Sequence, residues 1–211
     1  MIKKSKGLLI SFEGGEGAGK TVQIKLLVDE LRRQGQEVVI TREPGGTTIS
    51  EQIRQVLLSP KNVEMAFTTE VLLYQAARAQ IYQELILPSL TAGKLVLCDR
   101  SRDSSVVYQG VARGFDEKLI EQLNDISTEN TYPDAVILLD LPVKTGLARR
   151  NGSKKIDRLD MEKEEFHEKV RKGYLKLAKR RSRNWIVIDG AKSINQVHRD
   201  ILSALQKMEI M

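Results

Sequence analysis

The chain has 211 residues, of which 41% are hydrophobic and 29% charged, a balance typical of one compact domain with a substantial core. No apolar run approaches the ~20 residues that cross a bilayer, so we expect no membrane partner. Residues 1–7 leave no room for a signal peptide, and one cysteine cannot form an internal disulfide. We therefore expect a cytoplasmic protein. The formal net charge of +6 raises the question of a nucleic-acid partner, but basic and aromatic residues do not interleave as in single-strand binders, and we expect phosphate-bearing small molecules instead.

Short apolar runs alternate along the chain with longer amphipathic stretches, which is the pattern of a parallel sheet covered by helices on both faces. We expect strands at 7–12, 37–41, 95–99, 135–140 and 185–188. We expect helices near 19–34, 48–58, 64–91, 103–110, 116–129, 143–151, 160–181 and 193–208. No repeat, linker or low-complexity tract interrupts the pattern. The sequence therefore predicts a single α/β domain over residues 1–211, with a five-stranded parallel sheet and a ligand site beyond the carboxyl ends of its strands.

The first predicted strand runs into a glycine-rich segment, Gly14-Gly15-Glu16-Gly17-Ala18-Gly19-Lys20-Thr21. This segment fits the pattern G-x-x-x-x-G-K-[ST], in which the glycines let backbone N–H groups surround a polyphosphate. Lys20 can reach the β- and γ-phosphate oxygens, and the Thr21 hydroxyl can ligate Mg²⁺. An ordinary glycine-rich turn is the alternative, but a strand before the segment and a helix after it favour a nucleoside triphosphate site.

Two predicted strands end in an aspartate that could hold a Mg²⁺-bound water. We favour Asp99, because Arg100 beside it supplies a phosphate clamp. Asp140 ends the other strand, but it precedes Leu141-Pro142 and a predicted helix, which it could equally cap. Cys98 lies within an apolar strand and is expected to be a buried, inert thiol.

Basic residues gather in two segments of the C-terminal part of the chain. The first segment contains Arg149, Arg150, Lys154, Lys155 and Arg158, and it could close over phosphates as a lid at about 149–158. The second runs from Lys169 to Arg183 on a predicted helix and is better explained as a solvated helix face. Arg42, after the second strand, could face phosphates or pair with a local carboxylate, and we expect His167 and His198 to be solvated or packing residues.

Several further motifs occur together in a specific order: Phe12-Glu13-Gly14, Thr41-Arg42-Glu43-Pro44-Gly45-Gly46-Thr47, Ala76-Ala77-Arg78, Asp99-Arg100, Asp103-Ser104-Ser105 and Tyr108-Gln109-Gly110. With the glycine-rich segment, they make the chain resemble the bacterial-type thymidylate kinases along almost its whole length. The resemblance implies a three-layer P-loop nucleoside monophosphate kinase fold, with helices flanking the sheet. It also implies transfer of a phosphoryl group from ATP, with Mg²⁺ as cofactor, to dTMP, and assembly into a homodimer.

On the donor side, the resemblance implies that ATP is bound by Gly14, Gly15, Glu16, Gly17, Ala18, Gly19, Lys20 and Thr21. Thr21 and Asp99 would lie at the metal. The variable P-loop positions carry no arginine, so lid arginines would neutralise the transferred group. Arg149 and Arg158 would take this part, and Lys20, Arg100 and Glu16 would complete the catalytic set.

On the acceptor side, the resemblance implies binding of dTMP by Glu43, Pro44, Arg54, Tyr74, Arg78, Arg100, Ser104, Ser105, Tyr108 and Gln109. Arg54 and Arg100 would clamp the phosphate. Arg78 and Gln109 would hydrogen-bond the thymine edge, with Ser104 and Ser105 nearby. Tyr74 would stack on the ring, and it shares a helix face with Arg78 because the two are four residues apart. Tyr108 would lie under the deoxyribose and crowd a 2′-hydroxyl.

Three positions depart from the usual pattern of these kinases. Ser101 stands where an aromatic residue usually follows the Asp-Arg pair, Tyr74 stands where phenylalanine is more common, and Ile81 stands where a histidine is common. These changes bear on acceptor affinity and on tolerance of dUMP, and they leave the ATP site intact.

Three other functions make different predictions. A kinase for another nucleotide would lack the joint readout by Arg78 and Gln109. A GTPase switch would carry an Asn-Lys-x-Asp motif after the fourth strand, where this sequence reads Asp140-Leu141-Pro142-Val143. A nucleic-acid-binding ATPase would be stimulated by DNA or RNA.

Overall fold

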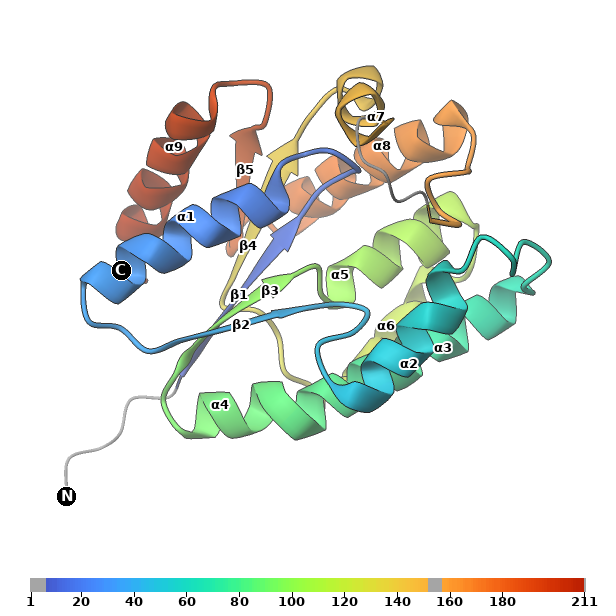
Figure 1. The fold of residues 1–211 in the computed structure, drawn as a ribbon, viewed down its shortest axis with the longest axis horizontal. Helices are drawn as coiled ribbons and strands as arrows, with labels where there is room; N and C mark the ends of the chain where they lie inside the picture. The colour runs from blue at the N-terminus through green and yellow to red at the C-terminus, as the bar shows by residue number, and fades with distance from the viewer. Residues whose placement is uncertain (1–6, 152–156, 211) are drawn as a thin grey trace.

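A five-stranded, all-parallel sheet with the strand order β2-β3-β1-β4-β5 forms the centre of the molecule (Figure 1). The computed structural model describes residues 7–151 and 157–210. The strands are β1 (Leu8–Glu13), β2 (Val38–Arg42), β3 (Leu95–Asp99), β4 (Ala135–Asp140) and β5 (Trp185–Asp189). The predicted α/β fold with five parallel strands is confirmed, and each strand begins and ends within one residue of its predicted position.

Helices cover both faces of the sheet, because side chains alternate along each buried strand. On one face Ile10 and Phe12 of β1 pack with α1 (Lys20–Arg33) and α9 (Ile194–Lys207). On the other face, strand residues such as Leu9 and Val136 pack beneath a second group of helical elements. This group includes α3 (Phe67–Ile81), the π-helical segments η1 (Tyr82–Ile86) and η2 (Val106–Ala112), α4 (Leu87–Thr91), and α8 (Glu164–Arg180). The remaining helices are α2 (Thr48–Leu58), α5 (Arg102–Ser105), α6 (Glu117–Ser127) and α7 (Val143–Asn151).

The long helix expected at 64–91 is a continuous helical run from Phe67 to Thr91 that changes register at η1. Leu87 donates its backbone N–H to Tyr82 O, one residue further back than in an α-helix. Pro88 follows immediately, and a proline has no N–H and clashes with the preceding turn of a regular helix. The wider π turn accommodates Pro88 without a break in the helical run.

The parallel arrangement brings the carboxyl ends of all five strands to one edge of the sheet. Arg42 is in register with Asp99, Asp99 with Phe12, and Asp140 with Asp189. The polar residues that follow the strands therefore meet at this edge, which is where ligands bind in open α/β sheets.

Among the described residues, no helix is long and apolar enough to cross a membrane.

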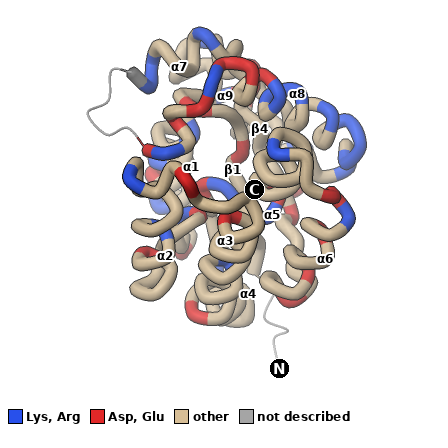
Figure 2. The backbone as a smooth tube through the Cα atoms, turned by 90° about the vertical axis from the view of Figure 1, so that its right-hand side faces the viewer, with Lys and Arg blue, Asp and Glu red and all other residues tan. Residues whose placement is uncertain are grey.

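The basic residues of α8 include both solvated and paired side chains, and Figure 2 shows their positions along this helix. Lys169, Lys172, Lys176 and Lys179 are exposed, as expected for a solvated face. Arg171, however, forms an ion pair with Asp140, and Arg181, just after the helix, pairs with Asp103 and Glu121. Part of this basic segment thus fastens α8 to neighbouring elements.

Candidate active site

A cavity of about 710 Å³ lies at the carboxyl edge of the sheet. Its walls come from the P-loop, the end of β2, helices α2, α3 and α5, the residues after β3, and η2. Every residue predicted on the acceptor side lines it: Glu43, Pro44, Arg54, Tyr74, Arg78, Arg100, Ser104, Ser105, Tyr108 and Gln109. So do Asp99 and the P-loop residues Glu16, Gly17, Ala18, Gly19, Lys20 and Thr21. The fold thus gathers the acceptor set and most of the P-loop around one space, whereas Gly14 and Gly15 are not among the lining residues.

The P-loop wraps closely against the start of α7 and opens into α1. Gly17 has a φ of 67°, and a Cβ there would overlap the carbonyl oxygen of Gly146 in α7. Gly19 has a φ of 93° and leads directly into α1, which begins at Lys20. Because both positions lie in the left-handed region, glycine is the residue that adopts them without strain. The N-terminus of α1 therefore points its N–H groups and positive dipole at the cavity.

Lys20 is buried beneath the P-loop, where its Nζ donates to the carbonyl oxygens of Gly14 at 3.1 Å and Gly15 at 3.0 Å. Burial and the nearby charge of Arg100 lower the pKa of Lys20 below its ordinary value, and nearby carboxylates oppose this shift. A bound phosphate would supply the opposite charge that a buried ammonium needs. The Lys20 site is thus suited to a polyphosphate.

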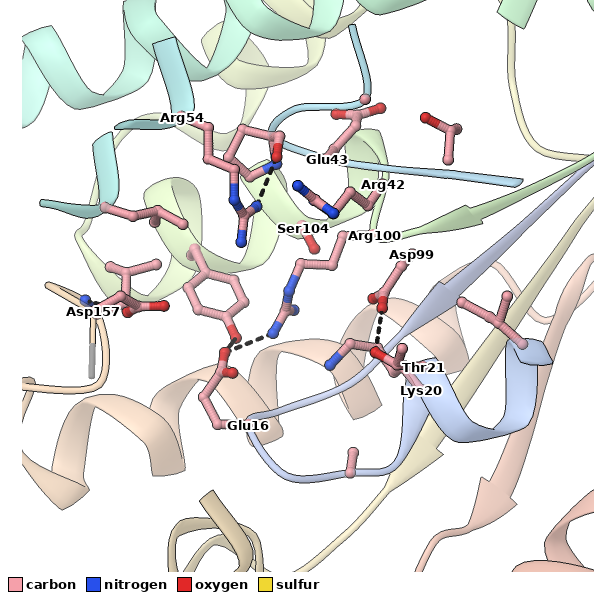
Figure 3. A pocket seen from close by; sticks show the side chains of 18 of the residues that line it. Glu16, Lys20, Thr21, Arg42, Glu43, Arg54, Asp99, Arg100, Ser104 and Asp157 are labelled. Carbon is pink, nitrogen blue, oxygen red and sulfur yellow. Dashed lines mark hydrogen bonds and ion pairs between the residues drawn. The ribbon is translucent and has the colours of Figure 1, made fainter. Parts of the chain in front are cut away.

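Thr21 and Asp99 bring two hard oxygen donors together, because the Thr21 hydroxyl donates to Asp99 Oδ2 at 2.9 Å (Figure 3). Asp140, the alternative carboxylate, is instead held by Arg171, whose Nε and Nη2 donate to its oxygens at 2.7 and 2.9 Å. Among the described residues there is no cluster of three or more acidic, histidine or cysteine ligands. Mg²⁺ commonly takes one or two protein oxygens together with waters and substrate phosphates, so the Thr21–Asp99 pair fits this ion.

Arg100 occupies a strained backbone position directly after β3, with a φ of 68°. Its backbone N–H donates to Phe12 O at 2.9 Å, and the carboxylate of the buried Glu13 accepts the next N–H, that of Ser101, at 2.8 Å. These bonds hold the turn that sends the Arg100 guanidinium into the cavity, where Figure 3 shows it near Lys20 and Arg54. The cost of a left-handed non-glycine residue is of the order of 1–3 kcal/mol and is typical of functional sites.

Glu16 is the P-loop residue that contacts residues predicted on the acceptor side. Arg100 Nη2 lies 2.6 Å from its Oε1, and the Tyr108 hydroxyl donates to the same oxygen at 3.0 Å. Burial raises the pKa of Glu16, but the charges of Arg100 and Lys20 outweigh burial and lower the pKa to about 2. Glu16 is therefore an ionised carboxylate at any physiological pH.

Arg78 is held rigidly at the floor of the cavity, with only 1% of the residue exposed. Its Nε donates to Glu43 Oε2 at 2.6 Å, and its Nη1 donates to Ser105 Oγ at 3.0 Å and to Asn124 Oδ1 at 2.7 Å. Gln109 lies nearby, and its Nε2 donates to the carboxylate of Glu70 at 2.8 Å. Such dense pairing fixes both side chains in one orientation before any ligand arrives.

Arg54 extends from α2 to the cavity, and its Nη1 donates to Pro44 O at 2.6 Å.

Ser101, one of the three departures from the usual pattern, is fully buried, and its hydroxyl lies 3.1 Å from that of Tyr82. The ring of Tyr82 in η1 thus lies next to residue 101, the position at which the resemblance predicts an aromatic residue. His167 is buried against Phe166, and Cys98 is buried, as expected for a packing histidine and an inert thiol.

The two predicted lid arginines do not lie on the cavity wall. Arg149 donates to Gly190 O at 3.3 Å, in the loop after β5. Arg158 is only 6% exposed, and it lies 2.6 Å from Glu70 Oε2 while its Nε donates to Leu57 O at 2.9 Å. Residues 152–156 of the predicted lid, including Lys154 and Lys155, lie outside the described residues.

Several residues of the site were not singled out as site residues from the sequence. Arg150, Asp157 and Leu159 line the cavity, and Glu70 and Asn124 hold residues that do. Arg150 and Asp157 fall in the predicted lid, so their position in that segment was the signal. Glu70 and Asn124 carry no local motif, and only tertiary packing brings them to Gln109 and Arg78.

The fold and the site together define a P-loop nucleoside monophosphate kinase: a parallel sheet of this order, a phosphate-binding loop, and a second set of cationic and polar side chains facing it across one cavity. Residues 12–201 match the family model described as thymidylate kinase. The chain therefore belongs to the thymidylate kinase family, whose members phosphorylate dTMP to dTDP with ATP as donor.

Individual relatives agree with this assignment. The chain is 47% identical over 205 residues to a thymidylate kinase of Geotalea uraniireducens, covering 94% of this chain and 96% of the relative. It is 48% identical to one of Geobacillus sp., covering 95% and 96%. A crystal structure of thymidylate kinase from Ehrlichia chaffeensis superimposes with a TM-score of 0.77 at 34% identity, covering 95% of this chain and 98% of that one.

Proposed function

We propose that the cavity holds ATP at the P-loop and dTMP against α3, α5 and η2, so that the two phosphates meet between Lys20 and Arg100. The observation that carries this proposal is the convergence of Lys20, Arg100 and Arg54 on one space from separate elements (Figure 3). Three cations around one point suit a group whose charge spreads over its oxygens during transfer.

On the donor side, the P-loop N–H groups and Lys20 bind the ATP phosphates. Thr21 and Asp99 would hold Mg²⁺, which supplies positive charge to the phosphates when bound. On binding, a phosphate oxygen replaces the Gly14 and Gly15 carbonyls as the partner of Lys20. This exchange leaves the ammonium paired in both states.

On the acceptor side, Arg54 and Arg100 clamp the dTMP phosphate, and Arg78 and Gln109 bind the base edge. Tyr74 stacks on the base, and its four-residue spacing from Arg78 places both on one side of α3. Tyr108 lies under the sugar and Glu16 between donor and acceptor, where its carboxylate orients Arg100. The Glu43 carboxylate pairs with Arg78, and the Pro44 carbonyl accepts from Arg54, so these two residues hold the arginines in place.

The chemical step needs no general base. The attacking oxygen belongs to a phosphate monoester, which is largely ionised at neutral pH. This oxygen bonds to the γ-phosphorus of ATP, the bond from that phosphorus to the β–γ bridging oxygen breaks, and ADP leaves with the electron pair. Catalysis is therefore alignment and charge neutralisation, and enclosure prevents competing hydrolysis.

We also propose that Arg149 and Arg158, in the lid at about 149–158, neutralise the transferred group, because the P-loop supplies no arginine. For Arg158 this role requires that the side chain leave Glu70 when ATP binds.

Residues 1–211 are proposed to act as one domain and to assemble into a homodimer. The proposed compartment is the reducing cytoplasm. The lone, buried Cys98 is compatible with that compartment, which cell fractionation tests.

An acceptor panel tests the proposed function. ADP release would be followed with dTMP, dUMP, dCMP, dGMP, UMP and thymidine, each with Mg·ATP. We expect dTMP to be the preferred acceptor, and thymidine, which lacks the phosphate for Arg54 and Arg100, to be inactive. A preference for another nucleotide, or turnover stimulated by DNA or RNA, would refute the assignment of this cavity.

A further inference from the structure

Glu70 is a buried carboxylate on α3 that the mechanism above does not use, and it lies behind the cavity wall rather than on it. Only 1% of the residue is exposed. Its Oε1 accepts from Gln109 Nε2 at 2.8 Å, and its Oε2 lies 2.6 Å from Arg158 and 3.3 Å from Arg113. It thus connects a predicted base-reading side chain to the buried Arg158 and the half-buried Arg113.

The two arginines keep Glu70 ionised. Burial raises the pKa of Glu70, but the hydrogen bond from Gln109 and the charges of Arg113 and Arg158 outweigh burial and lower the pKa below its ordinary value. Arg113 is itself held by Glu162 at 2.6 Å, so the group remains together without a ligand. An ionised carboxylate can only accept hydrogen bonds.

An acceptor-only neighbour determines which way the Gln109 amide faces. The amide has two donors on Nε2 and an acceptor at Oε1, and Glu70 can pair only with Nε2. No described residue donates to Oε1, and the protein does not enclose this atom, so Oε1 faces the cavity that Gln109 lines. Gln109 therefore presents an acceptor to the bound base, while Arg78, a guanidinium, presents only donors.

We propose that Glu70 is a specificity-determining positioning residue: by fixing the Gln109 amide, it makes the site accept pyrimidines with a protonated N3 and refuse those with an N3 lone pair. Thymine and uracil offer an N3–H donor beside the O4 acceptor, which match Gln109 Oε1 and Arg78. Cytosine offers the reverse pattern, an N3 acceptor beside an N4 amino donor. This inference rests on the proposed acceptor site.

The test is the binding of dUMP and dCMP, which differ only at this base edge, measured by calorimetry. For the unaltered chain we expect dUMP to bind at least about 100-fold more tightly, because dCMP would leave buried polar groups facing like groups. In Glu70→Gln, residue 70 can donate as well as accept, so the Gln109 amide can rotate. We expect the preference to fall by about tenfold or more, roughly the cost of one mismatched hydrogen bond.

A matched control and a rescue variant separate positioning from general damage. Glu162→Gln also removes a carboxylate from Arg113 but does not touch Gln109, so the preference should stay within about threefold of the unaltered chain. The exchange Glu70→Gln with Gln109→Glu reverses the donor and the acceptor of this pair. It again leaves an acceptor oxygen of residue 109 for the base, so it should restore most of the preference. Loss in Glu162→Gln equal to that in Glu70→Gln, or no rescue in the folded exchange variant, overturns the proposal.

Gln109→Ala separates the role of Gln109 in base binding from the role of Glu70. If Gln109→Ala keeps the full dUMP preference, Gln109 does not read the base, and both its assignment to the acceptor site and the role of Glu70 fail. If Gln109→Ala loses the preference and Glu70→Gln keeps it, the acceptor site stands and the role of Glu70 fails.

A measurement on the unaltered chain applies even where Glu70→Gln does not fold. With ¹⁵N-labelled glutamine, the Gln109 side-chain NH₂ signal is identified by its absence in Gln109→Ala. We expect its carboxylate-bonded proton to exchange slowly with solvent and to keep its chemical shift when dUMP binds, since the ligand meets Oε1. A fast-exchanging NH₂ group, or one strongly shifted by dUMP, places the amide the other way round and overturns the proposal.

Discussion

At the scale of single residues, Asp99 and Asp140 show how similar sequence contexts acquire different roles. Both end a buried strand at the same edge of the sheet. Asp99 accepts from the P-loop Thr21, whereas both oxygens of Asp140 are occupied by Arg171. The carboxylate that remains available to a metal is therefore the one beside the P-loop.

Asp99→Asn is expected to raise the Mg²⁺ concentration for half-maximal rate by about tenfold or more, since an amide oxygen is a weaker ligand than a carboxylate. The rate would be measured across a Mg²⁺ titration at saturating ATP and dTMP. Asp140→Asn serves as the control, and we expect its Mg²⁺ requirement to stay unchanged. Equal shifts in the two variants would contradict the assignment.

Arg158→Ala tests whether a buried, paired arginine also acts in catalysis. If Arg158 neutralises the transferred group, kcat should fall by about 100-fold or more while KM for dTMP changes little. Steady-state kinetics on the folded variant would show this, with Arg183→Ala, an exposed basic residue, as the control. A lower melting temperature with unchanged kcat would instead make Arg158 a structural anchor for Glu70 and Leu57.

At the scale of elements, the backbone of the P-loop packs directly against that of α7. Gly146 lies inside α7, where alanine would ordinarily be the better helix former. Here a Cβ on residue 146 would overlap the carbonyl oxygen of Glu16. The glycine thus lets a helix lie directly against the phosphate-binding backbone.

Gly146→Ala should displace the P-loop and lower kcat/KM for ATP by roughly tenfold to 100-fold, the cost of a misplacement near 1 Å. Thr145→Ala is the matched control, because it is an exposed position of the same helix that gains helix propensity without a clash. Steady-state kinetics with varied ATP would compare the two. An unchanged kcat/KM in Gly146→Ala would show that this contact does not position the P-loop.

At the scale of the whole molecule, Glu13 links the stability of the protein to pH. Burial, together with the charge of Asp103, raises its pKa from 4.5 to about 7. Between these values the folded protein holds a proton that the unfolded chain has lost. The free energy of unfolding should therefore decrease as pH rises from about 4.5 to 7 and then level off, by on the order of 3 kcal/mol for this group alone.

Glu13→Gln removes this titration and keeps a hydrogen-bonding side chain for Ser101, Ser104 and Tyr174. Urea unfolding at pH 5 and pH 8 would compare the variant with the unaltered chain. We expect the variant to gain stability relative to the unaltered chain as pH rises, and Glu64→Gln, at an exposed position, to show no such gain. A constant difference between the two pH values would contradict a buried, titrating Glu13.

The proposed homodimer predicts a sedimenting species of about twice the chain mass of 23.8 kDa. Large apolar side chains are exposed on the neighbouring helices α3 and α6, among them Phe67, Leu72 and Ile126. Leu72→Asp should shift the protein toward monomer in sedimentation velocity, because a charge would enter an apolar interface. Ile194→Asp, on α9 over the other face of the sheet, should not, and a monomeric unaltered chain would refute the dimer.

The sequence by itself predicted the five strands and the P-loop, because each depends on neighbouring residues: apolar runs for the strands, and glycines with Lys20 and Thr21 for the loop. The acceptor-side residues were predicted from the resemblance to thymidylate kinases, and their roles stay predictions. The end of the long helix at Thr91 was predicted, but the change of register at η1 needed the structure, since a π turn accommodates Pro88 without a break in the helical run.

Only the tertiary structure decided which partners the charged side chains have. Asp140 and Arg171 are 31 residues apart, Glu70 and Gln109 are 39 apart, and Arg158 reaches Leu57 across 101 residues. No local pattern encodes such pairs, because each depends on how separate helices pack onto the sheet and on which charges that packing removes from water. The same packing gives Arg158 a partner outside the cavity and places Glu70 behind Gln109, so the electrostatics of the site follow from the assembled fold.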